Sequence, residues 1–145
     1  MARHRILVVD DEDNLRDVLV EVLKRDGHEV DSAVDGTQAL HLLGERSYDL
    51  VLTDLRMPGI EGPELYQAMQ RRHPEKPPRV IFMSANTGIE QYARFLSETG
   101  EPALEKPFNL ADMRQVVLQV LTQKPPPPAS ALPRRSPVDG GAVRW

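Results

Sequence analysis

The sequence contains no cysteine, which excludes disulfides, thiol nucleophiles and cysteine-ligated zinc or iron–sulfur centres. It also lacks any apolar run near the roughly 18 residues of a membrane span. The N-terminal segment becomes acidic at Asp10 after a short apolar run, unlike a signal peptide. Its 145 residues, 40% hydrophobic and 28% charged, fit one globular domain. We therefore expect a cytoplasmic protein that makes no contact with a membrane.

Clusters of basic residues, which nucleic-acid binding requires, are also missing. Residues 1–123 contain 14 Lys and Arg against 21 Asp and Glu, whereas residues 124–145 contain four against one. An acidic body is a poor ligand for nucleic acid, so we expect no direct binding to it. The turn at Asp10 and Asp11 carries no glycine-rich phosphate loop, which argues against a nucleotide-binding module.

The composition changes abruptly at Lys124. Six of the 13 prolines lie in the last 22 residues, and four of these are consecutive, at positions 125–128. Consecutive prolines cannot continue a helix and favour an extended polyproline II segment. The sequence therefore predicts one domain over residues 1–123, followed by a Pro-rich linker or disordered tail over residues 124–145.

Two hydrophobic periods alternate along residues 1–123. Short apolar runs such as Ile6–Val9 are typical of strands buried on both faces, and the spacing within 15–23 is that of a helix with one buried face. We expect Asp13 to cap this helix and Gly27 to end it. The predicted strands are 6–9, 29–34, 49–53, 79–83 and 103–105, and the helices lie within 15–23, 36–43, 61–72, 89–96 and 110–121. Five βα repeats predict a flavodoxin-like doubly wound parallel α/β sheet with strand order 2-1-3-4-5.

Polar side chains follow four of the five predicted strands. The first strand ends at Asp10 and Asp11, the third at Asp54, the fourth at Ser84 and the fifth at Lys106. Each residue alone is more typical of a turn or a solvated surface, but a parallel sheet brings all of these strand ends to one edge. Three neighbouring carboxylates repel one another and need a cation, and oxygen ligands favour Mg²⁺. With one ammonium and one hydroxyl, they form a site suited to phosphoryl transfer onto a carboxylate.

Four segments carry a family resemblance. Residues 8–12, 54–59, 83–85 and 106–108 resemble, in order and spacing, the signature segments of receiver domains of two-component response regulators. The resemblance covers about residues 3–122. It implies a signalling switch, not a turnover enzyme, that promotes its own phosphorylation and dephosphorylation.

The resemblance assigns Asp54 as the phosphoacceptor. It implies that Asp11 and Asp54 bind Mg²⁺ directly, with Mn²⁺ as a substitute ion, and that Asp10 binds mainly through water. The backbone carbonyl of Arg56 is the remaining protein ligand. Arg56 and Asn86 are implied to flank the path of the hydrolytic water and so to tune the lifetime of the phosphoryl group.

The resemblance also implies roles at the last two strand ends. Ser84 and Lys106 bind the phosphoryl oxygens, and Ala85 leaves room for them. The Lys106–Pro107 bond matches one that is cis in this family, where it turns the lysine inward. Many members carry an aromatic residue whose rotation reports phosphorylation, but Ala103 stands at that position.

The implied phosphoryl donor is a histidine kinase or histidine phosphotransfer protein, and the output is contact with a protein target in trans or with a fused domain. We expect a monomer, or a weak dimer through the face of the fourth helix, fifth strand and fifth helix. A pseudo-receiver that binds proteins without phosphorylation stays open as an alternative. A phosphatase of the haloacid-dehalogenase type would need an acid at Arg56 and a cap domain.

Overall fold

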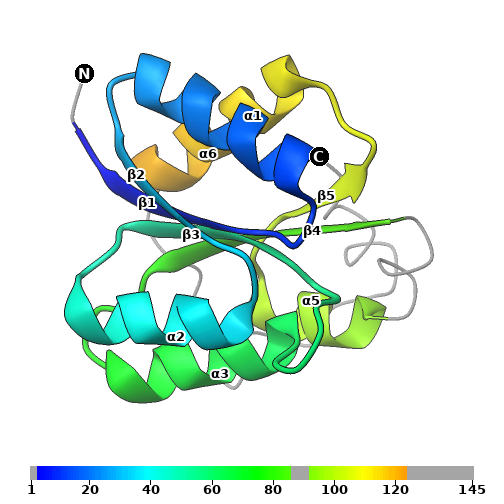
Figure 1. Cartoon of the computed structure of the whole chain (residues 1–145). Coiled ribbons are helices and arrows are strands. Elements are labelled where there is room, and N and C mark those ends of the chain that lie inside the picture. Colours follow the sequence, from blue (N-terminus) through cyan, green and yellow to red (C-terminus); the bar gives the residue numbers. More distant parts are fainter. Residues whose placement is uncertain (1–2, 86–91, 124–145) are drawn as a thin grey trace.

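A five-stranded parallel sheet in the order β2-β1-β3-β4-β5 forms the centre of the computed structural model, which describes residues 3–85 and 92–123 (Figure 1). The strands are β1 (Arg5–Val9), β2 (Glu29–Ala33), β3 (Leu50–Asp54), β4 (Arg79–Ala85) and β5 (Ala103–Lys106). Every neighbouring pair is parallel. The predicted flavodoxin-like fold and strand order are therefore confirmed.

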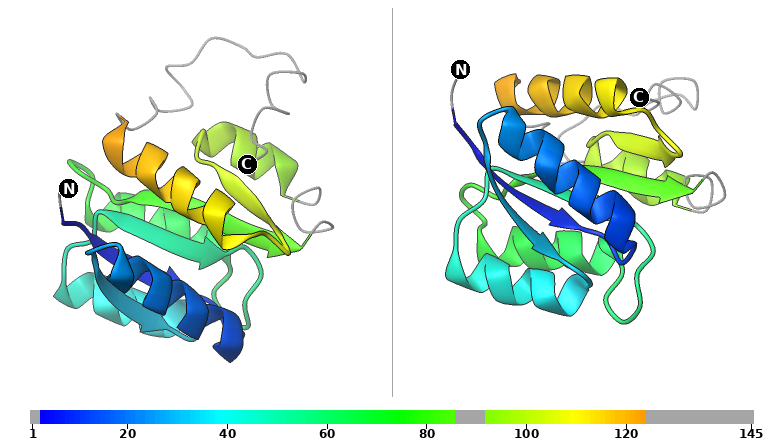
Figure 2. Two further views of the ribbon diagram at one scale, coloured as in Figure 1. Left: turned by 90° about the horizontal axis from the view of Figure 1, so that it is seen from above. Right: turned by 45° about the horizontal axis from the view of Figure 1, so that its top comes forward.

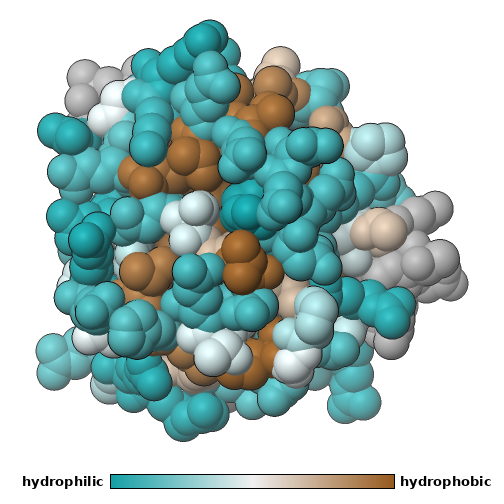
Figure 3. All heavy atoms as spheres, in the orientation of Figure 1, coloured by the Kyte–Doolittle hydropathy of each residue, from teal (hydrophilic) through white to brown (hydrophobic). Residues whose placement is uncertain are grey.

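Helices cover both faces of the sheet, as Figures 1 and 2 show. On one face lie α1 (Asp13–Arg25) and α6 (Leu110–Thr122), and on the other lie α2 (Gly36–Glu45), α3 (Gly62–Arg72) and α5 (Ala93–Thr99). Among the described residues, no helix is long and apolar enough to cross a lipid bilayer. On the face shown in Figure 3, polar side chains predominate and apolar ones gather in small groups.

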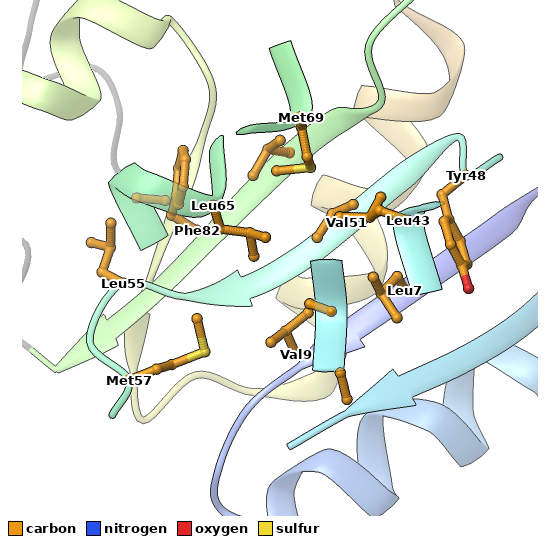
Figure 4. Packing of buried hydrophobic residues seen from close by; sticks show 14 of the residues in the cluster. Leu7, Val9, Leu43, Tyr48, Val51, Leu55, Met57, Leu65, Met69 and Phe82 are labelled. Carbon is orange, nitrogen blue, oxygen red and sulfur yellow. The ribbon is translucent and has the colours of Figure 1, made fainter. Parts of the chain in front are cut away.

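Alternate residues of the inner strands supply two separate hydrophobic cores, because successive side chains of a strand point to opposite faces. Leu7, Val9 and Val51 belong to the core beneath α2, α3 and α5, which Figure 4 shows from close by. Ile6 and Leu52 belong to the core beneath α1 and α6. All five residues of β3 are buried, so both of its faces are covered. This explains why its apolar residues, at positions 50–52, are consecutive and do not alternate with polar ones.

The ends of α1 differ in part from expectation. Gly27, at φ 96°, ends the helix as predicted, and its amide donates to the Lys24 carbonyl while the His28 amide donates to that of Leu23. The prediction that Asp13 caps the helix was wrong. Glu12 is the N-cap residue and makes no side-chain capping bond, and Asp13 is already helical, where its carboxylate pairs with Arg16.

The fourth strand extends two residues beyond its predicted end. Ser84 and Ala85 lie inside β4 because they pair with Glu105 and Lys106 of β5, so the predicted end of β5 also moves by one residue. The predicted fourth helix begins in residues 86–91, which lie outside the described residues. The described part of that helix, α5, ends at Gly100 with φ 69°.

A buried ion pair lies at the amino-terminal end of the sheet. Glu101, 4% exposed, accepts hydrogen bonds from the Arg79 guanidinium at 2.8 Å and from the Val80 amide at 3.0 Å. The guanidinium also donates to the carbonyls of Val120 and Gln123 at the end of α6. The pair therefore joins β4, the segment before β5 and the last turn of α6.

Gly62 determines how closely α3 approaches the end of β3. A Cβ atom at this position would lie 2.9 Å from the Leu55 Cα atom and 3.0 Å from the Asp54 carbonyl oxygen. Both neighbours are backbone atoms and cannot rotate away. Gly62 thus lets the first turn of α3 pack directly on the chain that leaves Asp54.

We expect Gly62→Ala to lower the free energy of unfolding by about 1–3 kcal/mol, because the added methyl group overpacks this contact. Gly44→Ala is the matched control inside α2, where the new Cβ would meet only the flexible Arg72 Nη1 atom, at 3.2 Å. That control should stabilise the protein by up to about 1 kcal/mol. Urea denaturation measures both variants, and equal stability of the two would contradict this account of Gly62.

Candidate functional site

Five polar side chains meet at the carboxyl ends of the strands, beside the point where strand order reverses between β1 and β3. Asp54 is the last residue of β3, and Asp10 and Asp11 directly follow β1. Ser84 lies near the end of β4, and Lys106 is the last residue of β5. The parallel order of the strands thus brings together residues as far apart in the sequence as positions 10 and 106.

Lys106 bridges the two buried carboxylates. Its Nζ atom lies 2.8 Å from the Asp10 Oδ2 atom and 2.9 Å from the Asp54 Oδ2 atom. Burial lowers the pKa of Lys106, but the hydrogen bonds to Asp10 and Asp54 outweigh this and raise it above its usual value. The ammonium therefore stays charged and is held at the centre of the site.

Burial dominates the electrostatics of Asp54. It raises the pKa of this carboxyl above its ordinary value, although the hydrogen bond and charge of Lys106 act in the opposite direction. The Asp54 Oδ1 atom also accepts a bond from the Arg56 amide at 3.2 Å. One ammonium thus compensates the carboxylate only in part, and an added cation nearby would favour its ionised form.

The three aspartates form a cluster that could bind a metal ion. One carboxylate oxygen each of Asp10, Asp11 and Asp54 lies within 4.8 Å of the other two. The Asp10 Oδ1 atom accepts from the Glu12 amide at 2.8 Å, which fixes the orientation of this fully buried carboxylate. Asp11 is exposed and leaves the cluster open to solvent. An oxygen-only set with an open side suits Mg²⁺, which keeps several of its waters.

The other predicted site residues lie around this cluster. Ser84 is 1% exposed, and Ala85 is exposed and pairs with Lys106 in the β4–β5 register. The Lys106–Pro107 peptide bond is cis. Asn86, predicted to flank the path of the hydrolytic water, lies outside the described residues.

Arg56 and Ala103 also occupy defined places. Arg56 is exposed in the connection after β3, where its amide contacts Asp54. Ala103 begins β5, is 4% exposed and belongs to the same core as Phe82, so only a methyl group fills this position.

Two side chains beside the site were not predicted from the sequence. The Arg16 Nη1 atom donates to the Asp10 carbonyl at 2.7 Å, and the helical spacing of Arg16 from Asp13 was a signal for at least their ion pair. The Tyr92 hydroxyl donates to the Glu61 Oε1 atom at 2.7 Å. Tyr92 is half-buried against the core, and its place in the predicted helix within 89–96 is a signal for burial but not for this bond.

Comparisons with known proteins agree with this geometry. The family model described as "Response regulator receiver domain" matches residues 6–118. Regulatory protein AtoC of Escherichia coli is 37% identical over 120 residues, which are 83% of this chain and 26% of AtoC. Sporulation initiation phosphotransferase F of Bacillus subtilis is 31% identical over 124 residues, 86% of this chain and 98% of that protein.

The chain spans about a quarter to a half of the length of several curated relatives, from 26% of AtoC to 52% of TcrA from Mycobacterium tuberculosis. Among solved structures, TrrA from Thermotoga maritima in complex with Mg²⁺-BeF is 34% identical, with a TM-score of 0.69 over 81% of this chain and 98% of TrrA. A receiver domain protein from Clostridium thermocellum has a TM-score of 0.72 at 27% identity, covering 81% and 94% of the two chains. The order of the strands, the aspartate cluster at their ends and these matches together show that the chain belongs to the response regulator receiver domain family.

Proposed function

We propose that this receiver domain is a Mg²⁺-dependent switch in which Asp54 accepts a phosphoryl group from a phosphohistidine. The observation that carries the proposal is the position of Asp54, which is bonded to Lys106 and clustered with Asp10 and Asp11. The donor is a histidine kinase or a histidine phosphotransfer protein. The signal leaves by contact with a target protein, either separate or fused.

The transfer forms one bond and breaks another. An Asp54 carboxylate oxygen attacks phosphorus, the phosphorus–nitrogen bond of the phosphohistidine breaks, and the imidazole leaves with the electron pair and takes up a proton. Asp11 and Asp54 would hold Mg²⁺ directly and Asp10 mainly through water, and the ion would supply positive charge to the phosphoryl oxygens. Lys106 supplies a second positive charge, since its Nζ atom already contacts the Asp54 Oδ2 atom.

The remaining site residues complete the proposal. The Arg56 carbonyl would be the last protein ligand of the metal, and Ser84 would donate to a phosphoryl oxygen beside the small Ala85. Arg56 and Asn86 flank the water that returns Asp54 to its free form. The complex of the related TrrA with Mg²⁺-BeF supports the choice of ion.

We further propose that the folded domain spans residues 1–123 and that residues 124–145 form a linker or tail. The domain is a monomer, or a weak dimer that associates through the face of α5, β5 and α6. Several relatives that are much longer than this chain are named transcriptional regulators, which supports an output carried by a fused domain or by a separate protein.

Asp54 should be the residue that gains the phosphoryl group. With Mg²⁺ and a small phosphodonor such as acetyl phosphate, intact-mass spectrometry should show one added phosphoryl group on the wild type and none in excess EDTA. Asp54→Asn should stay unmodified, whereas Asp49→Asn, which changes the residue directly before the other end of β3, should behave as the wild type. A wild type that never gains the mass would favour the pseudo-receiver alternative.

The two other aspartates should differ in their effects on stability. The cluster oxygens lie within 4.8 Å of one another, and like charges at that limit repel by about 3.5 kcal/mol at an effective dielectric constant of 20 and by about 1 kcal/mol in water. Asp11→Asn should therefore raise Tm in EDTA by about 2–4 °C. Asp10→Asn removes a buried partner of Lys106 and should lower the free energy of unfolding by about 1–3 kcal/mol.

Both variants should lose the rise in Tm that Mg²⁺ gives the wild type, because each lacks one member of the metal cluster. Thermal denaturation followed by circular dichroism, with and without Mg²⁺, measures this. Full Mg²⁺ stabilisation of Asp11→Asn would show that Asp11 is not a ligand.

Ser84 should couple the phosphoryl group to α5. Its hydroxyl is buried at the end of β4, and a hydrogen bond to a charged group contributes about 1.5–3 kcal/mol. With Mg²⁺ and beryllofluoride, a phosphoryl mimic, amide hydrogen exchange over residues 84–98 should change in the wild type. The change should be largely lost in Ser84→Ala, and a full response in that variant would exclude this route.

A further inference from the structure

The Tyr92–Glu61 hydrogen bond connects the two chain segments that leave the site. Glu61 follows Asp54 by seven residues and is the N-cap of α3, while Tyr92 follows Ser84 by eight and directly precedes α5. The distance from the Tyr92 hydroxyl to the Glu61 Oε1 atom is 2.7 Å. The Glu61 amide in turn donates to the Glu64 side chain at 3.4 Å, so the acceptor belongs to the first turn of α3.

The surroundings of Tyr92 keep its hydroxyl protonated and able to donate. Burial and the hydrogen bond to Glu61 both raise the pKa of Tyr92 above its usual value. The charges of Arg56 and Asp54 also act on this hydroxyl, in opposite directions. A change in the charge at Asp54, the proposed phosphoacceptor, would therefore be felt at the Tyr92 hydroxyl.

Aromatic contacts make a second attachment of α5 to the same elements. Phe95 of α5 packs edge-on against Tyr66 of α3, with ring centres 5.6 Å apart, and against Phe82 of β4, at 5.3 Å. Ala103 belongs to this core cluster but carries only a methyl group. The aromatic rings at this end of the sheet thus come from α3, β4 and α5, not from β5.

We propose that the Tyr92–Glu61 hydrogen bond holds α5 against α3 only while Asp54 is unmodified, and so opposes the active conformation. The proposal rests on the proposed function of Asp54. When the Ser84 hydroxyl moves toward a phosphoryl oxygen, we expect Tyr92, eight residues further along the chain, to move relative to Glu61, which stays with α3. A contact made in one state alone shifts the equilibrium between the two states.

Tyr92→Phe tests this with little change in packing. Because it removes a bond of the inactive state alone, it should tighten beryllofluoride binding by about threefold to tenfold in the presence of Mg²⁺. The affinity is measured from the dependence of Tm on beryllofluoride concentration at fixed Mg²⁺. Asp54→Asn should show no beryllofluoride-dependent rise in Tm.

Tyr48→Phe is the matched control. The Tyr48 hydroxyl donates to the Asp31 Oδ2 atom, also at 2.7 Å, but Tyr48 precedes β3 at the opposite end of the sheet. Both variants lose a tyrosine–carboxylate bond and should be less stable than the wild type without ligand. Tyr48→Phe should nevertheless keep the wild-type affinity for beryllofluoride, so loss of stability alone cannot account for tighter binding.

A second readout follows the hydroxyl group directly. In protein labelled with 3-fluorotyrosine, the ¹⁹F resonance that disappears in Tyr92→Phe should shift in the labelled wild type when Mg²⁺ and beryllofluoride are added. The resonance assigned through Tyr48→Phe should stay in place.

The outcomes separate this proposal from the proposed function. If the wild type does not bind beryllofluoride, the proposed function of Asp54 fails. If the wild type binds and depends on Asp54, but Tyr92→Phe binds equally or more weakly, the hydrogen bond exists in both states and our inference about Tyr92 is overturned. An unshifted Tyr92 resonance in the bound wild type would overturn it as well.

Discussion

The charge of Lys106 between Asp10 and Asp54 is the interaction on which the rest of the site depends. The side chains of these two carboxylates are 0% and 11% exposed, and the ammonium lies within hydrogen-bond distance of both. The ammonium satisfies one oxygen of each, and backbone amides satisfy the other two. The negative charge that the ammonium leaves uncompensated is the property that would attract a divalent ion, since the cluster contains three carboxylates and only one lysine bonds to it.

This arrangement requires β1, β3 and β5 to end at one level, and the helix connections make that possible. Parallel strands joined by right-handed crossovers bring all their carboxyl ends to the same edge. Gly62 packs closely on the Leu55 backbone, so the first turn of α3 lies directly against the end of β3 at Asp54. The fold therefore contributes position, and the side chains at the strand ends contribute charge.

Much of this could be predicted from the sequence. Continuous apolar runs identify strands that are buried on both faces, and the rule of parallel strand ends then brings Asp10, Asp54 and Lys106 together. The end of β4 could not be read in this way, because Ser84 and Ala85 join the strand by pairing with β5, a partner about twenty residues away in the sequence. The cap of α1 was misplaced for a related reason: an acidic residue before a helix can be its cap or its first residue, and the contact with Arg16 decides for Asp13. The bond between Tyr92 and Glu61 joins residues 31 positions apart, and no local period of the sequence encodes it.

The buried Arg79–Glu101 pair has a consequence for whatever the chain carries beyond its last described helix. Arg79 binds the carbonyls of Val120 and Gln123, so it anchors the end of α6 at the amino-terminal end of the sheet. The 13 residues of α6 span about 20 Å, and the aspartate cluster lies at the other end of the sheet. A segment that leaves the domain after Gln123 therefore departs from a fixed point remote from Asp54. A conformational change at the aspartate cluster can therefore reach such a segment only through the packed elements of the domain.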